Sequence, residues 1–285
     1  CHYSPFCQNR SKFDHDYSQS YKKLFKIQED FNTWEILGFM GKDNLQLGDG
    51  PIARESYFME TAGFKSDGGT TDPYYGVPFD GVIGLNHGPF SLFGNLINQG
   101  LISKPVLALF FRPEKGEVMF GDVDKNSYRG SLTFTEVQGI GWTFNLQTIR
   151  IGRTETVCID GCRARIATAD PYIGGPGPEI ERINSILGTT KTAEGTYVVD
   201  CRNKRRLPNI GFIISGQEFV LKPVEYIVEV QTPNGIQCNS GFAEARGRFN
   251  TTWNLGHNFL RSVYTVLEAP PYGGAGHGRV GFAYS

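Results

Sequence analysis

The chain has 285 residues, including 36 glycines and 15 prolines, and its formal net charge at pH 7 is −1. This charge gives no electrostatic reason to expect nucleic acid or an anionic membrane surface as a partner, and no run of eighteen apolar residues indicates a membrane-spanning helix. The glycines and prolines, together with 21 phenylalanines and 13 tyrosines, suit many short strands joined by tight turns. We therefore expect an all-β fold with a few short helices.

The first part of the chain predicts strands that end at glycine-rich turns. Strands are expected around residues 24–27 and 43–47, and the second is followed by the turn at residues 48–50. Residues 79–85 form an apolar run, which we interpret as a buried strand. Apolar residues at helical spacing predict a helix within residues 91–102, with Gly100 near its end.

The second part of the chain repeats this alternation of strands and brief helices. A helix is predicted to begin near Pro178 and to bury Ile180, Ile183 and Leu187. A faint similarity between the region from residue 79 and residues 253–260 suggests a twofold duplication. We predict two lobes, residues 1–130 and 131–285. Strands are predicted at residues 106–111, 117–120, 131–137, 140–152 (as a pair), 197–201, 210–214, 218–221, 226–230, 263–267 and 279–283.

The cysteines indicate disulfides rather than a metal site. Six cysteines allow 15 pairings, so their number alone does not fix the connectivity. Local spacing suggests two short bridges and leaves one longer one. Zinc is the competing interpretation for the Cys-x-x-x-Cys motif, but no second Cys/His pair has metal-ligand spacing, so no metal is expected. The suggested pairs are Cys1–Cys7, Cys158–Cys162 and Cys201–Cys238.

Two further features agree with an oxidising, secretory location. Disulfides form and persist outside the cytosol. Asn9 and Asn250 each begin an Asn-x-Ser/Thr sequence that accepts glycans, although so short a pattern also occurs by chance. We expect a secreted, extracellular or lumenal protein, the last in lysosomes or the digestive tract.

Segments spread along nearly the whole chain form one recognisable pattern: Cys1 to Cys7, residues 13–14, 18–21, 41–43, 79–85, 94–102, 121–124, 128–132, 207–210, 255–266 and 279–283. This pattern resembles that of pepsin-like aspartic proteases. The resemblance implies a bilobed acid-protease fold. Its N-terminal lobe would be incomplete here, because the strand with the first catalytic Asp would precede Cys1. The three suggested cysteine pairs match the bridges of that family.

The same resemblance places a degenerate catalytic loop at residues 166–173. The family has Asp-Thr-Gly-Ser/Thr there, but this chain has Ala167, Thr168, Ala169 and Asp170. Two carboxylates that share a proton activate the water in such enzymes. We therefore expect no intact catalytic acid. Asp170 could substitute only by reaching back over the turn, so a solvated or loop-capping role is favoured. Because Ala169 replaces a glycine, the loop is also expected to relax outward.

The mobile hairpin that covers the cleft in that family also differs here. A Tyr-Gly pair is expected, and residues 28–32 stand in its place. Phe31 or Trp34 could cover the cleft, but packing is the favoured role for both. Glu29 and Asp30 are the other candidates for this flap. Elsewhere, Asn254 replaces an apolar residue and puts a polar amide near the support of the catalytic loop.

A basic segment at residues 202–206, Arg-Asn-Lys-Arg-Arg, fits none of these assignments. It is basic enough to bind a glycosaminoglycan or to be cut by a processing protease, but a solvated loop is the favoured interpretation.

Three functional hypotheses follow from the resemblance. The first is a secreted homologue that is inactive as this chain stands. It would keep the cleft as a surface for a peptide or protein ligand, or serve in an assembly whose other chains complete the N-terminal lobe. The second is an active acid endopeptidase of digestive type, degrading blood or dietary protein, with a preceding segment supplying one Asp and Asp170 the other. The third is a purely structural partner. No cofactor is expected.

Overall fold

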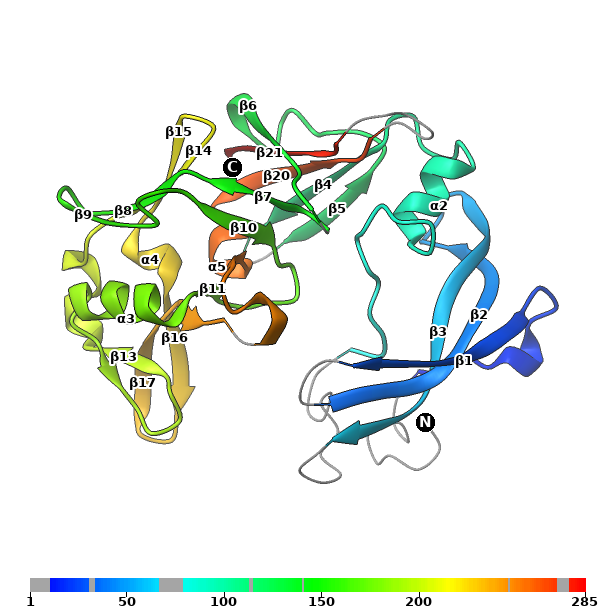
Figure 1. The fold of residues 1–285 in the computed structure, drawn as a ribbon, viewed down its shortest axis with the longest axis horizontal. Coiled ribbons are helices and arrows are strands. Elements are labelled where there is room, and N and C mark those ends of the chain that lie inside the picture. Colours follow the sequence, from blue (N-terminus) through cyan, green and yellow to red (C-terminus); the bar gives the residue numbers. More distant parts are fainter. Residues whose placement is uncertain are drawn as a thin grey trace. The chain divides into compact units, whose positions relative to one another are not determined.

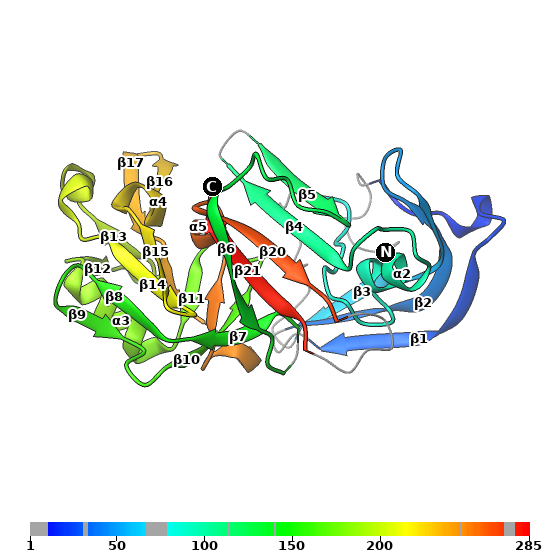
Figure 2. The same cartoon turned by 90° about the horizontal axis from the view of Figure 1, so that it is seen from above.

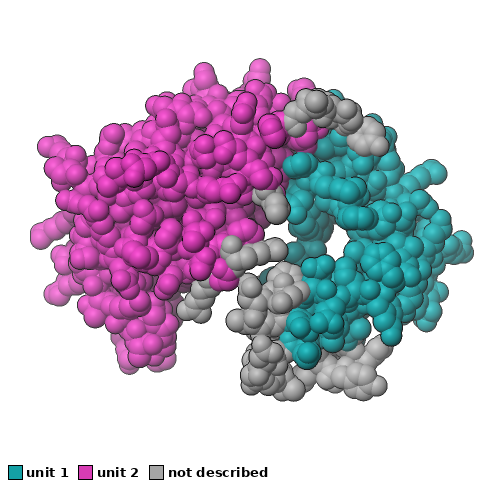
Figure 3. Space-filling model, viewed as in Figure 1, with its two compact units in different colours: residues 1–103 teal, residues 104–285 magenta. Residues whose placement is uncertain are grey.

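This computed structural model describes residues 11–30, 34–66, 79–112, 115–139, 141–245, 247–270 and 277–285. The chain forms two compact units, residues 1–103 and 104–285 (Figure 3). The fold is mostly β with a few short helices, as predicted. In the described ranges, no helix is long and apolar enough to cross a membrane. The lobe boundary predicted at residue 130 falls inside a strand, Arg129–Glu136, and remains a prediction.

A curved antiparallel sheet dominates the first unit (Figure 1). Its strands are β1 (Lys22–Asp30), β2 (Trp34–Gln46) and β3 (Ile52–Ser66), in the order β1-β2-β3. The turn from β2 to β3 is closed by the amide of Gly50, which donates to the carbonyl of Leu47 at 3.0 Å. Gly48 has a φ of 54°, which glycine adopts without steric cost. The turn predicted at residues 48–50 is confirmed.

One short α-helix packs against this sheet. It is α2 (Leu92–Asn98), and the side chain of Ser91 caps it by accepting from the amide of Gly94 at 3.0 Å. Its apolar side turns Leu92, Phe93 and Leu96 inward. The helix predicted within residues 91–102 is confirmed, and it is shorter than the predicted range. A 3-10 turn, His15–Tyr17, precedes the sheet.

The prediction of a buried strand at residues 79–85 is wrong. These residues lie outside every strand of the described chain. Val82 and Ile83 are 69% and 51% exposed, and Phe79 is 40% exposed. An apolar run is buried only when the fold brings a neighbouring surface against it, and sequence periodicity does not report that neighbour.

The second unit contains many short strands, and its two largest sheets have five strands each. One sheet has the order β5-β4-β20-β21-β6, and its strands lie side by side in Figure 2. The predicted strands of this half are confirmed within a few residues. The bounds are β4 Val106–Phe111, β5 Gly116–Phe120, β6 Arg129–Glu136, β7 Thr143–Leu146, β8 Thr148–Ile151, β9 Glu155–Val157, β10 Cys162–Ile166, β11 Ile173–Gly175, β12 Thr190–Lys191, β13 Tyr197–Val199, β14 Ile210–Ile214, β15 Gln217–Leu221, β16 Ile227–Thr232, β17 Gly235–Ser240, β18 Phe242–Glu244, β19 Trp253–Leu255, β20 Val263–Glu268 and β21 Arg279–Tyr284.

Three more sheets complete this unit, and brief helices connect their strands. The sheets have the orders β18-β11-β19-β10-β7, β12-β13-β17-β16 and β15-β14-β8-β9. The large side chains that are fully buried in this unit include Trp253, Tyr226 and Phe282. The helices are α3 Gly177–Ile186, α4 Pro223–Tyr226 and α5 His257–Leu260, and the 3-10 turns are η2 Cys201–Arg206 and η3 Gly247–Phe249.

Helix α3 confirms the helix predicted near Pro178, and it anchors two neighbouring segments. Ile180, Ile183 and Leu187 are buried, as predicted. The carboxylate of Glu179 accepts from the amide of Cys158 at 2.9 Å and from the indole nitrogen of Trp253 at 3.0 Å. One side chain thus ties the helix to the disulfide loop and to β19.

Candidate functional site

The loop singled out by sequence lies between β10 and β11, with β19 between those strands (Figure 1). β10 runs parallel to β19, whereas β11 runs antiparallel to it. Ile166 before the loop and Ile173 after it both pair with Leu255 of β19. Both ends of the loop are therefore fixed on one residue of a buried strand.

The start of the loop is a closed turn. The amide of Asp170 donates to the carbonyl of Ala167 at 3.0 Å, and the amide of Ala167 donates to the carbonyl of Leu255 at 3.1 Å. Ala169 is not among the residues with positive φ, so its Cβ causes no backbone strain. The expectation that the loop relaxes outward at Ala169 remains a prediction. Ala167 is 4% exposed and places only a methyl group at this position.

The segment leading into α5 holds the other side of the loop. The amide of His257 donates to the carbonyl of Asp170, and its Nε2 donates to the carbonyl of Thr168, both at 2.8 Å. A Cβ on Gly256 would overlap the carbonyl oxygens of Tyr172 and Asp170. No sequence pattern indicated a role for His257. Its contact with the loop depends on a strand and helix 89 residues away along the chain.

Arg165 belongs to the candidate site, although no sequence pattern indicated it. It lies on β10 in register with Asn254 of β19, and its Nε donates to the Asn254 side-chain oxygen at 2.6 Å. The guanidinium lies 4.0 Å from the ring centroid of Phe249. The sequence did contain an indication of this contact, because Asn254 places a polar amide where the family resemblance predicts an apolar residue. Arg165 supplies the donor that this buried amide needs.

The carboxylate of Asp170 points to this arginine. The distance from Asp170 Oδ2 to Arg165 Nη2 is 3.5 Å, and the Asp170 side chain keeps 42% of its exposure. Burial raises the pKa of Asp170, and the positive charge of Arg165 opposes part of that rise. The structure therefore gives Asp170 a half-exposed ion pair, in addition to its backbone role in the turn.

The predicted flap residues lie at the β1–β2 end of the first unit. Glu29 pairs with Ile36, Asp30 with Glu35, and Trp34 with Ser66 of β3. Phe31 lies outside the described residues. β1 and β2 pair antiparallel here, and the role of these residues as a flap over the cleft remains a prediction.

The cysteine and glycan assignments are partly visible. Cys158–Cys162 and Cys201–Cys238 are disulfides, with Cα atoms 5.6 and 5.3 Å apart, which confirms both suggested pairs. Cys1, Cys7 and Asn9 lie outside the described residues. Asn250 is exposed in the turn after η3, and its glycosylation remains a prediction. Across the described ranges, no group of three or more His, Cys, Asp or Glu side chains is placed to hold a metal ion.

A methyl group at residue 167 neither accepts nor donates a proton. The polar groups in and around the loop are the Thr168 hydroxyl, the Asp170–Arg165 pair, the Asn254 amide, the His257 imidazole and backbone groups. The exposed part of the guanidinium and the loop backbone offer hydrogen-bond donors and acceptors to a peptide-like ligand.

Comparison with known proteins gives one consistent family. The model of the family described as "Eukaryotic aspartyl protease" matches residues 1–283. Rat (Rattus norvegicus) cathepsin E is 30% identical over 98% of this chain and 71% of its own length. Bovine (Bos taurus) pepsin A is 29% identical over 93% of this chain and 72% of its own. Bovine pregnancy-associated glycoprotein 2 is 30% identical over 93% of this chain and 70% of its own.

Proposed function

Because the chain belongs to the eukaryotic aspartyl protease family, we propose that it binds a peptide or protein segment and does not hydrolyse it. The catalysis of such proteases needs two carboxylates that share one proton across a water molecule. The observation that carries the proposal is Ala167, a buried alanine in the closed turn between β10 and β11. It stands where the family resemblance places the acid of this half.

The position of Asp170 further supports the absence of catalysis. Its carboxylate lies 3.5 Å from Arg165, on the side of the turn that leads to Asn254 and Phe249. To act as the missing acid it would leave this pair and reach back over Ala167. Loss of a group that works as a unit with a partner removes nearly all of the catalytic effect.

The proposal includes a location and a type of partner. The two disulfides support an oxidising, secretory or lumenal environment. The ligand is a peptide or protein segment, the substrate class of the family. Service as a subunit in a secreted assembly is part of the same proposal.

A digestion assay tests the absence of catalysis. The purified chain is incubated with denatured haemoglobin over an acidic pH range, with and without pepstatin, and fragments are detected by mass spectrometry. We expect no fragments that disappear with pepstatin. Pepstatin-sensitive cleavage would overturn the proposal. Binding is tested separately by titrating peptide libraries into the chain and measuring heat or anisotropy; absence of saturable binding would favour the purely structural role.

An active acid endopeptidase is the second candidate, favoured by the similarity to proteins named pepsin A and cathepsin E. In that case Asp170, whose pKa is raised by burial, would be the acid of this half. Asp170→Asn separates the two candidates. It would abolish cleavage in an active enzyme, and it would leave peptide binding intact in a non-hydrolysing one.

A further inference from the structure

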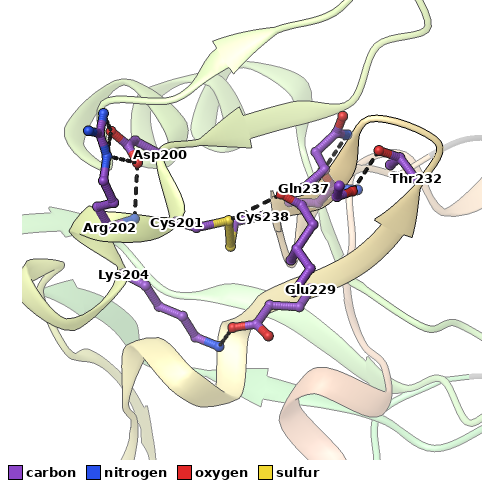
Figure 4. Close-up of a disulfide and its surroundings, with 11 residues drawn as sticks. Asp200, Cys201, Arg202, Lys204, Glu229, Thr232, Gln237 and Cys238 are labelled. Carbon is purple, nitrogen blue, oxygen red and sulfur yellow. Dashed lines mark hydrogen bonds and ion pairs between the residues drawn. A yellow bond between two sulfur atoms is a disulfide. The ribbon is translucent and has the colours of Figure 1, made fainter.

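The 3-10 turn η2 carries a concentrated basic sequence on the surface of the second unit. Four of its six residues are basic: Arg202, Lys204, Arg205 and Arg206. No residue of the turn is fully buried, although the Lys204 side chain is only 17% exposed. The segment therefore presents arginine and lysine side chains without contributing to the core (Figure 4).

Two of the four cations are already paired with carboxylates. Arg202 Nη2 lies 2.7 Å from Asp200 Oδ2, and Lys204 Nζ lies 2.9 Å from Glu229 Oε1 (Figure 4). Arg205 and Arg206 are both exposed, and over the described part of the chain no ion pair joins either. This partial neutralisation weakens the field that a polyanion would meet on the folded surface. This neutralisation matters less to a protease, because a protease unfolds the segment and binds each side chain separately.

A disulfide spans the basic turn. Cys201 is its first residue, and Cys238 is a buried residue of β17. Cys238 is also the only cysteine after Cys201 in the sequence. Any cut within residues 202–237 therefore leaves two pieces joined covalently by this bridge alone.

We propose that η2 is a processing site, cut after Arg205 by an endoprotease that reads basic side chains at the first, second and fourth positions before the cut. Arg205, Lys204 and Arg202 occupy those positions. Acidic pockets on the protease would bind them by charge-assisted contacts. Water supplies the balance of the reaction: its hydroxyl joins the Arg205 carbonyl carbon, the amide bond breaks, and its proton goes to the Arg206 nitrogen.

The local structure allows this turn to open at a low cost in free energy. A protease must draw several residues into an extended form, and a segment with no fully buried residue opens at lower free energy than a core strand. The exposed Arg202–Asp200 pair opposes this opening by roughly 0–1 kcal/mol. The Lys204–Glu229 pair opposes it as well, because the Lys204 side chain is only 17% exposed and must leave its contacts. The other run of adjacent basic residues, Lys22–Lys23, is in β1 and pairs with Lys42 and Gly41 of β2. Cutting there requires a strand to leave its sheet.

The cut chain is expected to stay folded. The piece after the cut supplies β14, β19 and β20, which pair with β8, β10 and β4 of the piece before it. These pairings do not involve the basic turn. The product is a two-chain molecule whose halves are held by strand pairing and by Cys201–Cys238.

The experiment uses the folded full chain and a subtilisin-like convertase that requires this basic pattern. Without reductant, we expect one species heavier by one water molecule; with reductant, we expect pieces ending at Arg205 and beginning at Arg206. Arg205→Gln should slow the cut at least about tenfold, since it removes a charge-assisted contact. Arg206→Gln is the matched control: it is equally exposed and lies beyond the cut, so it should be cut like the unaltered chain. Circular dichroism checks that both variants fold.

Three outcomes would overturn the proposal. The first is preferential cutting at Lys22–Lys23. The second is resistance of the folded chain under conditions in which the heat-unfolded chain is cut after Arg205. The third is equal cutting of Arg205→Gln and the unaltered chain. Retention on a sulfated polysaccharide resin, lost in both variants and accompanied by no cut, would assign the turn to polyanion binding instead.

Discussion

Asp170 supplies the carboxylate of the loop between β10 and β11, and its surroundings disfavour the ionised form. Burial raises its pKa, and Arg165 at 3.5 Å offsets only part of that effect. A carboxyl group with a raised pKa in the folded state binds its proton more tightly there than in the unfolded chain. Stability is therefore lost as the pH rises from the ordinary value of 3.8 through the raised value.

Asp170→Asn removes this pH-dependent cost. We expect the variant to equal the unaltered chain near pH 3 and to be more stable at neutral pH by at most about 1 kcal/mol, since solvent screens a half-exposed side chain. Urea denaturation at a series of pH values measures the difference. Asp160→Asn, at a carboxyl outside the loop, serves as the control for general charge effects. A variant less stable than the unaltered chain at neutral pH would show that the Arg165 pair dominates.

Gly256 is the residue on which the closure of the loop depends. A Cβ there would overlap two backbone carbonyl oxygens, those of Tyr172 and Asp170, which cannot rotate away. Gly256→Ala should destabilise the chain by about 1–3 kcal/mol or more, because the backbone must shift. Gly63→Ala is the matched control: the space around Gly63 is open, and its φ is not positive. Thermal unfolding of both variants checks this; equal melting temperatures would contradict it.

At the scale of elements, the pairing of β10 with β19 supports the loop at residues 166–173. Arg165 and Asn254 lie in register, and Arg165 Nε donates a hydrogen bond of 2.6 Å to the Asn254 side-chain oxygen. Asn254 is 5% exposed, so its amide needs a partner inside the protein. A polar pair thus occupies the support of the loop, where the family resemblance places an apolar residue at 254.

A double-mutant cycle measures the coupling between these strands. Arg165→Met leaves the buried Asn254 oxygen without its donor and should cost about 1–3 kcal/mol. Asn254→Leu should also destabilise, because Arg165 loses its acceptor. The double variant should be more stable than the sum of the single effects predicts, by about 0.5–3 kcal/mol. Denaturant unfolding of the four proteins gives the coupling. Simple additivity would mean that the two side chains act independently.

At the scale of the molecule, the apolar core is distributed unequally between the units. The buried apolar residues described before residue 104 are Ala53, Leu92, Phe93 and Leu96, whereas the strands and helices of the second unit supply the others. Of the sixteen exposed large apolar side chains among the described residues, ten lie in the first unit. Because burial of apolar surface is the main stabilising contribution to folding, we expect the first unit to be the less stable one.

Hydrogen exchange tests this inequality. The amides at the centres of β2 and β3 should exchange at least about tenfold faster than those of β14 and β20, which corresponds to an opening free energy lower by about 1.4 kcal/mol. The exposed β16–β17 hairpin in the second unit is the control for exposure alone. Equal protection of the two sets of strands would contradict the expectation.

Local features of the sequence determined many of this protein's turns, helix ends and short bridges. The turn at Gly48, the cap at Ser91, the helix near Pro178 and the short Cys158–Cys162 bridge all follow from interactions within a few residues. The proposed absence of an acid at residue 167 also came from the sequence, because it depends on the identity of one residue within the pattern of the family.

Only the tertiary structure decided the rest. It exposes Phe79, Val82 and Ile83, which lie in the segment that the sequence pattern assigned to a buried strand. It also joins Arg165 to Asn254, and His257 to Thr168, across 89 residues of chain in each case. The physical reason is the range of the interaction: turns and caps act between neighbours in sequence, whereas burial and cross-strand partners depend on which distant segment the fold brings alongside.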